Sequence, residues 1–357
     1  MTMPLVSTPL GLRAANLADS GERARIDAFV RAHPDATPFH LSGWSIAVER
    51  GCGQAAHMLV VERADGTLAG ILPLTETRSP LFGRALVSTG FGVGGGILAD
   101  DPAAVTSLGA AAWALAERLR CPTLDLRGGP VAGAGWSVDD TTYLDFVRPL
   151  AVDDDAELLA IPRKQRAEVR KALAGDLDIS VGNDRRHARD HYRVYAESVR
   201  NLGTPVFPAR LFREVLRAFG DDADILTVSA AGKPVASVLS LYFNGTVFPY
   251  WGGGTQAART LRANDRMYFA LMAHARSRGC KHFDFGRSKA GTGAAAFKKN
   301  WGFEPTSLVY HRRAATGEAP RDINPLNPRY RLKVAAWKRL PLWAANRIGP
   351  MISRGLG

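Results

Sequence analysis

The sequence predicts an α/β protein made of two similar units in tandem, each with a mixed, mostly antiparallel sheet flanked by helices, followed by a basic amphipathic tail. Three observations lead to this prediction. The chain has 357 residues, of which 46% are hydrophobic and 22% charged, a balance typical of globular domains with a core. A strand–turn–strand pattern occurs twice. A helix–cysteine–strand pattern also occurs twice, in the same order and about 160 residues apart, which indicates an internal duplication.

The first unit, residues 1–150, contains the first copy of both patterns. VVERADGTLAGILPL (60–74) alternates on both sides of Asp65-Gly66, as in a β-hairpin. An apolar-periodic helix is then expected over 103–120, with the strand TLDLR and its Asp125 after Cys121. The run TGFGVGGG (89–96) formally matches GxGxxG, but no helix is expected directly after it, so we do not expect a dinucleotide site.

The second unit, residues 151–315, repeats the order. Its connector, residues 147–160, is rich in Pro and Asp, and Asp155 is expected to cap the helix that follows. TVSAAGKPVASVLSL (227–241) forms the second hairpin, and a helix leads through Cys280 to the strand HFDFG. A strand, helix and strand after the hairpin predict a sheet that is antiparallel first and parallel late, and a closing helix is expected in each unit.

Charge favours an anionic partner. The net charge is +12 and the pI about 9.9, which suits nucleic acid, a nucleotide-linked substrate or an acidic lipid surface, although a generally basic proteome would give the same value. The three cysteines have no CxxC spacing, so neither a disulfide framework nor a zinc site is expected, and no metal is expected elsewhere. With no signal peptide or spanning segment recognised, a cytoplasmic protein is expected.

The stretch FDFGRSKAGTGAAAFKKNWGFEP (283–305) carries the main candidate site. Asp284 points opposite to its two neighbouring Phe rings on a strand, toward a cleft or toward backbone groups that it anchors. The following loop supplies groups that suit a phosphate or carboxylate: Arg287, Ser288, Lys289 and Thr292. Lys298, on the short helix after the loop, is placed to stabilise a developing oxyanion. For Lys299 the alternative is an ordinary solvated lysine on the helix surface.

Two further groups complete the expected site. The aromatic strand VFPYWGGG brings Tyr250 and Trp251 to Gly252 and Gly253, where a backbone without side chains lets a ligand approach closely. One ring is expected to face the core and the other a groove. Arg259 and Arg262 follow, before a helix that Asn264 or Asp265 would cap. The basic helix 161–173 contributes Arg163 and Arg166, as either an anion-binding or a solvated surface.

The tail, residues 316–357, is basic and amphipathic. Its last part, 325–357, has seven Lys and Arg residues and no acid, and Tyr330, Val334 and Trp337 share one helical face. A basic amphipathic segment with Trp is typical of a membrane-surface anchor. A helix that packs back on the protein with a solvated basic side is the alternative.

The sequence resembles the FemAB-related proteins of the exosortase (PEP-CTERM) and exopolysaccharide system of Gram-negative bacteria. YWGGGT, the stretch FDFGRSKAGTGAAAFKKNWGFEP and the terminal NPLNPRYRLKVAAWKRLPLWAANRIGP carry the resemblance, which is looser in the first unit. The resemblance implies two tandem GNAT-like acyltransferase domains. It also implies that Lys298 assists the transfer, that Tyr250 lines the acceptor channel and that Arg163 and Arg166 face the acceptor.

The donor implied by the resemblance is aminoacyl-tRNA or an acyl-CoA. The stretch ARTLRAND lacks the glycines of the usual CoA-pyrophosphate loop, although Arg259 and Arg262 could bind that group. We therefore expect an N-acyltransferase that transfers an acyl or aminoacyl group to an amine of an anionic, small or lipid-linked glycan precursor, at the inner face of the inner membrane. A non-catalytic glycolipid-binding protein is the alternative. RNA binding without catalysis is a third and weaker hypothesis. Among nucleic acids, tRNA remains an alternative partner and DNA is not expected.

Overall fold

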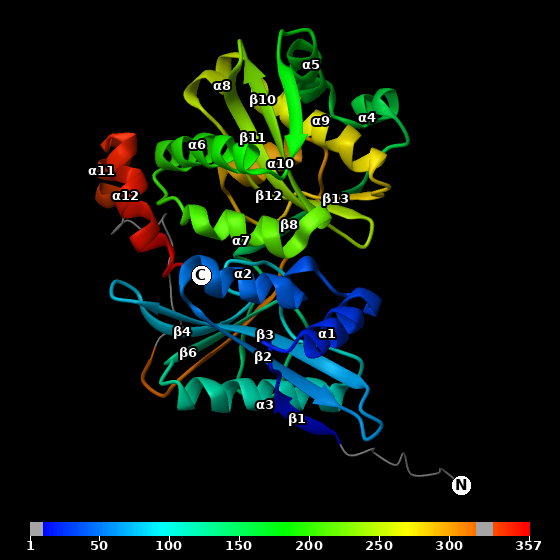
Figure 1. Cartoon of the computed structure of the whole chain (residues 1–357), viewed down its shortest axis with the longest axis vertical. Coiled ribbons are helices and arrows are strands. Elements are labelled where there is room, and N and C mark those ends of the chain that lie inside the picture. The colour runs from blue at the N-terminus through cyan, green and yellow to red at the C-terminus, as the bar shows by residue number, and fades with distance from the viewer. Residues whose placement is uncertain (1–9, 319–330) are drawn as a thin grey trace.

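The computed structural model describes residues 10–318 and 331–357 of the chain. Two mixed sheets lie in two halves of the molecule, each with helices on its faces (Figure 1). This arrangement confirms the mixed α/β fold that the sequence predicts.

The first unit begins with a short strand and two α-helices and then builds most of the first sheet. Its elements are, in chain order, β1 (Gly11–Ala14), α1 (Ser20–Ala32), η1 (Pro38–His40), α2 (Ser42–Cys52), β2 (Ala55–Glu62), β3 (Leu68–Ser79), β4 (Gly83–Ser88), β5 (Leu98–Ala99), α3 (Pro102–Arg118), β6 (Thr123–Arg127) and β7 (Ser137–Asp139). The strands β2, β3 and β4 pair antiparallel, whereas β4 and β6 are parallel. The sheet is therefore antiparallel first and parallel late, as expected.

The second unit repeats this order. Its elements are α4 (Asp154–Ala160), α5 (Arg163–Leu173), β9 (Asp178–Gly182), α6 (Arg185–Leu202), α7 (Ala209–Phe219), η2 (Gly220–Asp222), β10 (Ala223–Ala230), β11 (Lys233–Phe243), β12 (Thr246–Gly254), α8 (Gln256–Thr260), α9 (Ala263–Ser277), β13 (His282–Asp284), β14 (Ser288–Lys289), α10 (Gly293–Asn300) and β15 (Pro305–Ser307). Here β10, β11 and β12 pair antiparallel and β12 pairs parallel with β13. The same order of strand types in both units is what an internal duplication predicts.

Three local expectations need correction. Asp153, not Asp155, caps α4, because its carboxylate accepts the backbone N–H of Ala156 at 2.8 Å. The residue before α9 is Arg262, in the left-handed region at φ 53°, and neither Asn264 nor Asp265 caps that helix. The first unit has no closing helix, since the chain passes from β6 to β7, whereas α10 closes the second unit.

The two sheets exchange strands. β8 (Tyr143–Pro149) precedes the expected boundary at residue 150, yet it pairs with β13, β14 and β15 in the second sheet. In return β16 (Tyr310–Ala314) pairs with β6 and β7 in the first sheet. Each sheet is therefore completed by a strand that the predicted boundaries at 150 and 315 assign to the other unit.

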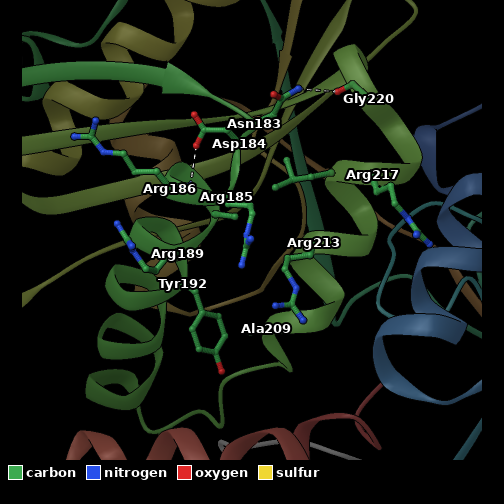
Figure 2. A pocket seen from close by; sticks show the side chains of 12 residues that line it. Asn183, Asp184, Arg185, Arg186, Arg189, Tyr192, Ala209, Arg213, Arg217 and Gly220 are labelled. Atoms are coloured by element: carbon green, nitrogen blue, oxygen red, sulfur yellow. Dashed lines mark hydrogen bonds between the residues drawn. The ribbon is translucent and has the colours of Figure 1, made fainter.

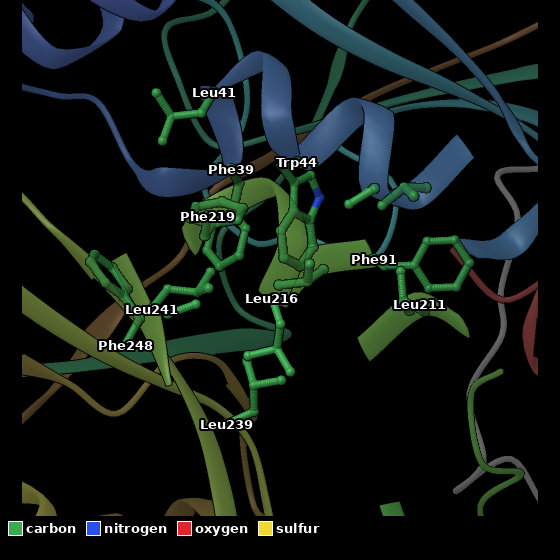
Figure 3. Close-up of a cluster of buried hydrophobic side chains, with 14 of the residues drawn as sticks. Phe39, Leu41, Trp44, Phe91, Leu211, Leu216, Phe219, Leu239, Leu241 and Phe248 are labelled. Atoms are coloured by element: carbon green, nitrogen blue, oxygen red, sulfur yellow. The ribbon is translucent and has the colours of Figure 1, made fainter. Parts of the chain in front are cut away.

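One hydrophobic core joins the two units. The equivalent helices α2 and α7 pack so closely that a Cβ atom on Gly51 would lie 2.6 Å from the Cα of Leu211. Around them, Phe39 and Trp44 of the first unit meet Phe219 and Phe248 of the second (Figure 3). Because this core is continuous across the junction, groups on facing sides of the two units are held in a fixed arrangement.

The tail packs back on the second unit. α11 (Arg331–Arg339) and α12 (Leu342–Ser353) both contact α6 (Figure 1). The hydroxyl of Ser353 donates to the carbonyl of Val206 at 2.8 Å, and Val334 lies against Gly203. Tyr330, which the sequence places on the same face, lies outside the described residues. In the described ranges, no helix combines the length and apolar character needed to cross a bilayer.

Candidate active site

A cavity of about 460 Å³ lies between the two units, where β12 and β13 move apart. These strands pair only at Thr246 and Val247, and beyond that point they diverge. Their diverging ends form two walls of the cavity, with Tyr250 and Gly252 on one and Asp284 to Arg287 on the other. Residues 91–94 of the first unit close the facing side. The site is thus at the carboxyl end of a strand, where α/β sheets usually bind ligands.

The equivalent opening in the first unit is filled by its own backbone. There β4 and β6 also pair only briefly, at Leu86 and Val87, and then separate. The glycine run 89–96 occupies the gap, and a Cβ atom on Gly96 would overlap the carbonyl oxygen of Gly128. The glycines of this run therefore serve close packing, against backbone at Gly96 and against the side chains of Thr75 and Thr89 at Gly90 and Gly95.

Lys298 reaches the cavity from α10. Its side chain is buried, with 9% of the residue exposed, while the neighbouring Lys299 is exposed. The ammonium donates hydrogen bonds to the carbonyls of Gly286 at 2.6 Å and Arg287 at 3.1 Å. An ammonium has three donors, so one N–H remains for a ligand. Burial lowers the pKa of Lys298 to about 8, a value that lets the group release a proton near neutral pH.

Asp284 faces a second carboxylate. Phe283 and Phe285 are buried, so Asp284 projects from the opposite side of β13, as the alternation predicts. Its carboxyl accepts the N–H of Gly286 at 2.7 Å and interacts directly with that of Asp145 from β8. Burial, and then the charge of Asp145, raise the pKa of Asp284 well above its usual range, and burial also raises that of Asp145. Two carboxyls this close titrate as a pair and not independently.

Two arginines add positive charge from opposite units. Arg287 lines the cavity with an exposed side chain, stacks 4.7 Å from the ring centroid of Tyr143 and donates to the hydroxyl of Tyr310 at 2.6 Å. Arg127, at the end of β6, lines the facing wall and bonds only weakly, at 3.4 Å, to the carbonyls of Thr89 and Gly92. Both guanidinium groups therefore have donors left to bind an anion.

The aromatic strand β12 supplies rings that form a wall of the cavity, and its one side-chain hydroxyl there, that of Tyr250, is already hydrogen-bonded. A bulge opposite Leu239 and Ser240 interrupts the alternation, so Tyr250 and Trp251 both pack on Trp44, at 5.4 and 5.7 Å between ring centroids. The hydroxyl of Tyr250 donates to the carbonyl of Phe91 in the first unit. Gly252 lines the cavity, whereas a side chain at Gly253 would meet Ser198. The expected split between a core ring and a groove ring is not observed.

Of the four polar side chains predicted on the loop after Asp284, only that of Arg287 lines the cavity. Ser288 is buried on β14, paired with Leu144. Lys289 lies beside it, with its ammonium 5.5 Å from the ring centroid of Tyr143. Thr292 caps α10, because its hydroxyl oxygen accepts the N–H of Ala295 at 3.3 Å. These three side chains shape the loop and the start of the helix that carries Lys298.

The remaining predicted arginines lie outside the cavity lining. Arg166 donates to the carbonyls of Leu159 and Ile161 and so closes the end of α4. Arg262 forms an ion pair with Glu168 of α5 at 2.5 Å. Arg163 and Arg259 are exposed at the surface. The predicted binding of the acceptor by Arg163 and Arg166, and of the donor by Arg259 and Arg262, therefore requires substrates that extend beyond the cavity.

Asp145, Arg127 and Tyr268 are among the cavity residues that were missed from sequence. Asp145 lies in LDF, a pattern like FDF, but only the strand exchange brings it beside Asp284. Arg127 ends the TLDLR strand, whose continuation meets the cavity. Tyr268 of α9 packs 4.7 Å from the ring centroid of Phe285. In residues 10–318 and 331–357, no group of three or more His, Cys, Asp or Glu side chains is placed to hold a metal ion.

The described arrangement matches a known domain. Residues 162–299, which include Asp284 and Lys298, match the model of the acetyltransferase (GNAT) domain. The comparison with curated proteins found no match. The fold of the chain is that of tandem GNAT proteins.

Solved structures of similar fold are known. FemX has a TM-score of 0.64 at 16% identity, over 81% of this chain and 95% of FemX. A tandem GNAT protein from the clavulanic acid biosynthesis pathway has a TM-score of 0.55 at 14% identity, over 87% of this chain and 100% of its own. L-PGS from Bacillus licheniformis has a TM-score of 0.53 at 13% identity, over 89% of this chain and 97% of L-PGS. At such identities the likeness concerns the fold alone.

Proposed function

We propose that the chain is an N-acyltransferase that moves an acyl or aminoacyl group from an activated ester or thioester to the amine of an anionic acceptor. The observation that carries this proposal is the meeting of the Asp145–Asp284 pair and Lys298 in one cavity of the GNAT-matching unit. A proton acceptor and a cationic proton donor are the two groups that direct acyl transfer needs.

The reaction proceeds by direct attack. The amine nitrogen of the acceptor forms a bond to the donor carbonyl carbon, and the carbonyl becomes an oxyanion that the ammonium of Lys298 stabilises. As the C–S or C–O bond breaks, the amine proton passes to the carboxyl pair and the leaving thiolate or alkoxide takes a proton from Lys298. No covalent enzyme intermediate is needed, so the main contribution of the protein is positioning and electrostatic stabilisation.

The acceptor is an anion because Arg127 and Arg287 face the same cavity from the two units. A phosphate or carboxylate held between them would place a nearby amine beside Asp284. A lipid-linked or nucleotide-linked glycan precursor of the cell envelope or of an exopolysaccharide has this chemistry. The resemblance to FemAB-related proteins of the exosortase system favours such a precursor.

The donor is an acyl-CoA or an aminoacyl-tRNA. The GNAT domain match favours the former, and the fold shared with FemX keeps the latter open. Arg262 is already paired with Glu168, so of the two predicted donor-binding arginines only Arg259 is available without breaking an ion pair. The carbonyl of either donor would enter between β12 and β13, where the strands diverge.

A location at the inner face of the membrane is part of the proposal. α11 and α12 leave Leu332, Trp343 and Met351 exposed, at 85%, 74% and 67%, on helices that also carry basic residues. Apolar side chains among cations suit an anionic lipid surface. Contact at the surface would bring the site to a lipid-linked acceptor.

The test compares Lys298→Gln with Lys299→Gln, which removes the same charge from an exposed neighbour. Both purified variants are assayed with acetyl-CoA, longer acyl-CoAs and aminoacyl-tRNA against amine-bearing sugar nucleotides. We expect the turnover of Lys298→Gln to fall by about 10²- to 10³-fold and that of Lys299→Gln to stay near wild type. Equal turnover in wild type and Lys298→Gln would rule out the role proposed for Lys298. Binding of an acceptor without turnover by any donor would favour the non-catalytic glycolipid-binding alternative.

A further inference from the structure

A second cavity lies outside the candidate active site. It is a groove of about 930 Å³ between α6 and α7, open to solvent, and it shares no lining residue with the cavity between the units. Figure 2 shows Arg185 of α6 and Arg213 of α7 pointing into the groove from its two sides. The proposed transfer reaction uses neither residue.

The charge of the groove is strongly positive. Five arginines line it: Arg185, Arg186, Arg189, Arg213 and Arg217. Arg217 is paired with Glu214 at 2.6 Å, and Arg186 and Arg189 lie 3.9 and 3.5 Å from Asp190. In the described part of the chain, Arg185 and Arg213 have no such carboxylate. Their charges are therefore available to an external anion.

The one acidic lining residue does not neutralise them. Asp184 caps α6, and its carboxylate accepts the backbone N–H groups of Arg186 and His187 at 2.8 and 3.0 Å. Asn183 is tied across the groove to the carbonyl of Gly220 at 3.4 Å. The polar groups at this end are thus already bonded, which leaves the guanidinium groups as the ligand-binding donors.

The floor of the groove is apolar. Ala188, Tyr192 and Leu216 line it, and the ring of Tyr192 packs 5.8 Å from that of Phe212. A bare inorganic anion would leave this surface and most of the volume without a partner. An anion joined to an organic group would use both the arginines and the floor.

We propose that this groove is a second ligand site, which binds a phosphate ester with Arg185 and Arg213 on the phosphate and the organic group on the floor. Guanidinium groups bind phosphate oxygens with two parallel N–H donors, so two of them from facing helices suit one phosphate. The ester is either soluble, as in a nucleotide, or the headgroup of a phospholipid. This inference does not depend on the proposed transfer reaction.

The experiment measures dissociation constants for two probes, uridine diphosphate and vesicles of phosphatidylglycerol, with vesicles of zwitterionic phosphatidylcholine, whose net charge is zero, as the reference. The variant is the double change Arg185→Gln/Arg213→Gln. Its matched control is Arg193→Gln/Arg210→Gln, which removes two exposed arginines from the same helices outside the groove. Melting curves check that both proteins are folded.

We expect one probe to bind wild type and the control alike, and to bind the groove variant at least roughly tenfold more weakly. Loss confined to uridine diphosphate identifies a soluble ester, and loss confined to phosphatidylglycerol identifies a lipid headgroup. Arg287→Gln, in the other cavity, should leave the difference in affinity between the groove variant and its control unchanged, because the two cavities share no lining residue. Equal weakening in both double variants, no binding of either probe, or a groove-dependent affinity for single-stranded RNA alone would overturn the proposal.

Discussion

The carboxyl groups of Asp145 and Asp284 interact directly, although they belong to strands from different units. β8 carries Asp145 into the second sheet and pairs with β13, where Asp284 lies. The strand exchange therefore does more than join the sheets, because it supplies one half of a buried carboxyl pair. A pair of this kind titrates as a unit, with pKa values that belong to the pair and not to either residue.

Removing one carboxylate should separate catalysis from stability. We expect Asp284→Asn to lower kcat by about 10²- to 10⁴-fold, since the amide cannot accept the amine proton. The amide oxygen can still accept the N–H of Gly286. The folded state raises the pKa of Asp284, so ionisation costs stability above its unfolded pKa. At pH 7 the melting temperature should therefore stay the same or rise.

The first unit of the internal repeat provides a matched control for Asp284→Asn. Asp125 occupies the equivalent strand position in the first unit, where it contributes to contacts with Arg312. Asp125→Asn should leave kcat within about twofold of wild type. A normal kcat for Asp284→Asn would instead assign Asp284 to anchoring the turn at Gly286.

The pH profile should report the charge of Lys298. Its folded-state pKa, lowered by burial to about 8, keeps the ammonium form below that pH and loses it above. If the ammonium stabilises the oxyanion, kcat falls as the pH rises through 8, about tenfold per pH unit. Measured between pH 6 and 10, Lys298→Arg should lose this fall and Lys299→Gln should retain it. A rate that rises through pH 8 would mean that the neutral amine of Lys298 acts as a base.

Tyr250 should matter for the junction between the units. Its hydroxyl bonds to the carbonyl of Phe91, so Tyr250→Phe removes a hydrogen bond between the two halves. We expect a loss of about 1 kcal/mol in the free energy of unfolding, or roughly 2 to 4 °C in melting temperature. Tyr192→Phe is the control, because no protein group bonds its hydroxyl in the described ranges. Equal melting temperatures for the two variants would show that the junction does not depend on this bond.

Sequence patterns predict well what depends on neighbours along the chain. The alternation of FDF predicts that Asp284 points away from the buried Phe rings. The helix after the loop brings Lys298 to the same cavity. The hairpins, the parallel last strand and the duplication follow from the same local rules. These features depend on periodicity and turn chemistry, which one sequence records directly.

What the sequence could not predict depends on contacts between distant segments. LDF alone does not reveal that β8 crosses into the other sheet, so Asp145 could not be paired with Asp284. Glu168 lies on a different helix from Arg262, and its ion pair removes a cation that the sequence assigns to the donor. The bulge before Trp251 likewise depends on β11 and turns both rings of the YW pair toward Trp44.

The filled opening of the first unit gives a final prediction. Gly96 has an ordinary backbone conformation, so its need for glycine is one of space: a Cβ atom would overlap the carbonyl of Gly128. Gly96→Ala must push the two backbones apart and should lower the free energy of unfolding by about 2 to 3 kcal/mol, as overpacking does. Gly43→Ala is the control, since its Cβ would lie 3.5 Å from Ala218 within a helix and should stabilise by about 0.5 kcal/mol or more. Urea unfolding of both variants measures the difference. If Gly96→Ala unfolds like Gly43→Ala, the backbones at residues 96 and 128 can move apart without a loss of stability, and Gly96 is not required for this packing.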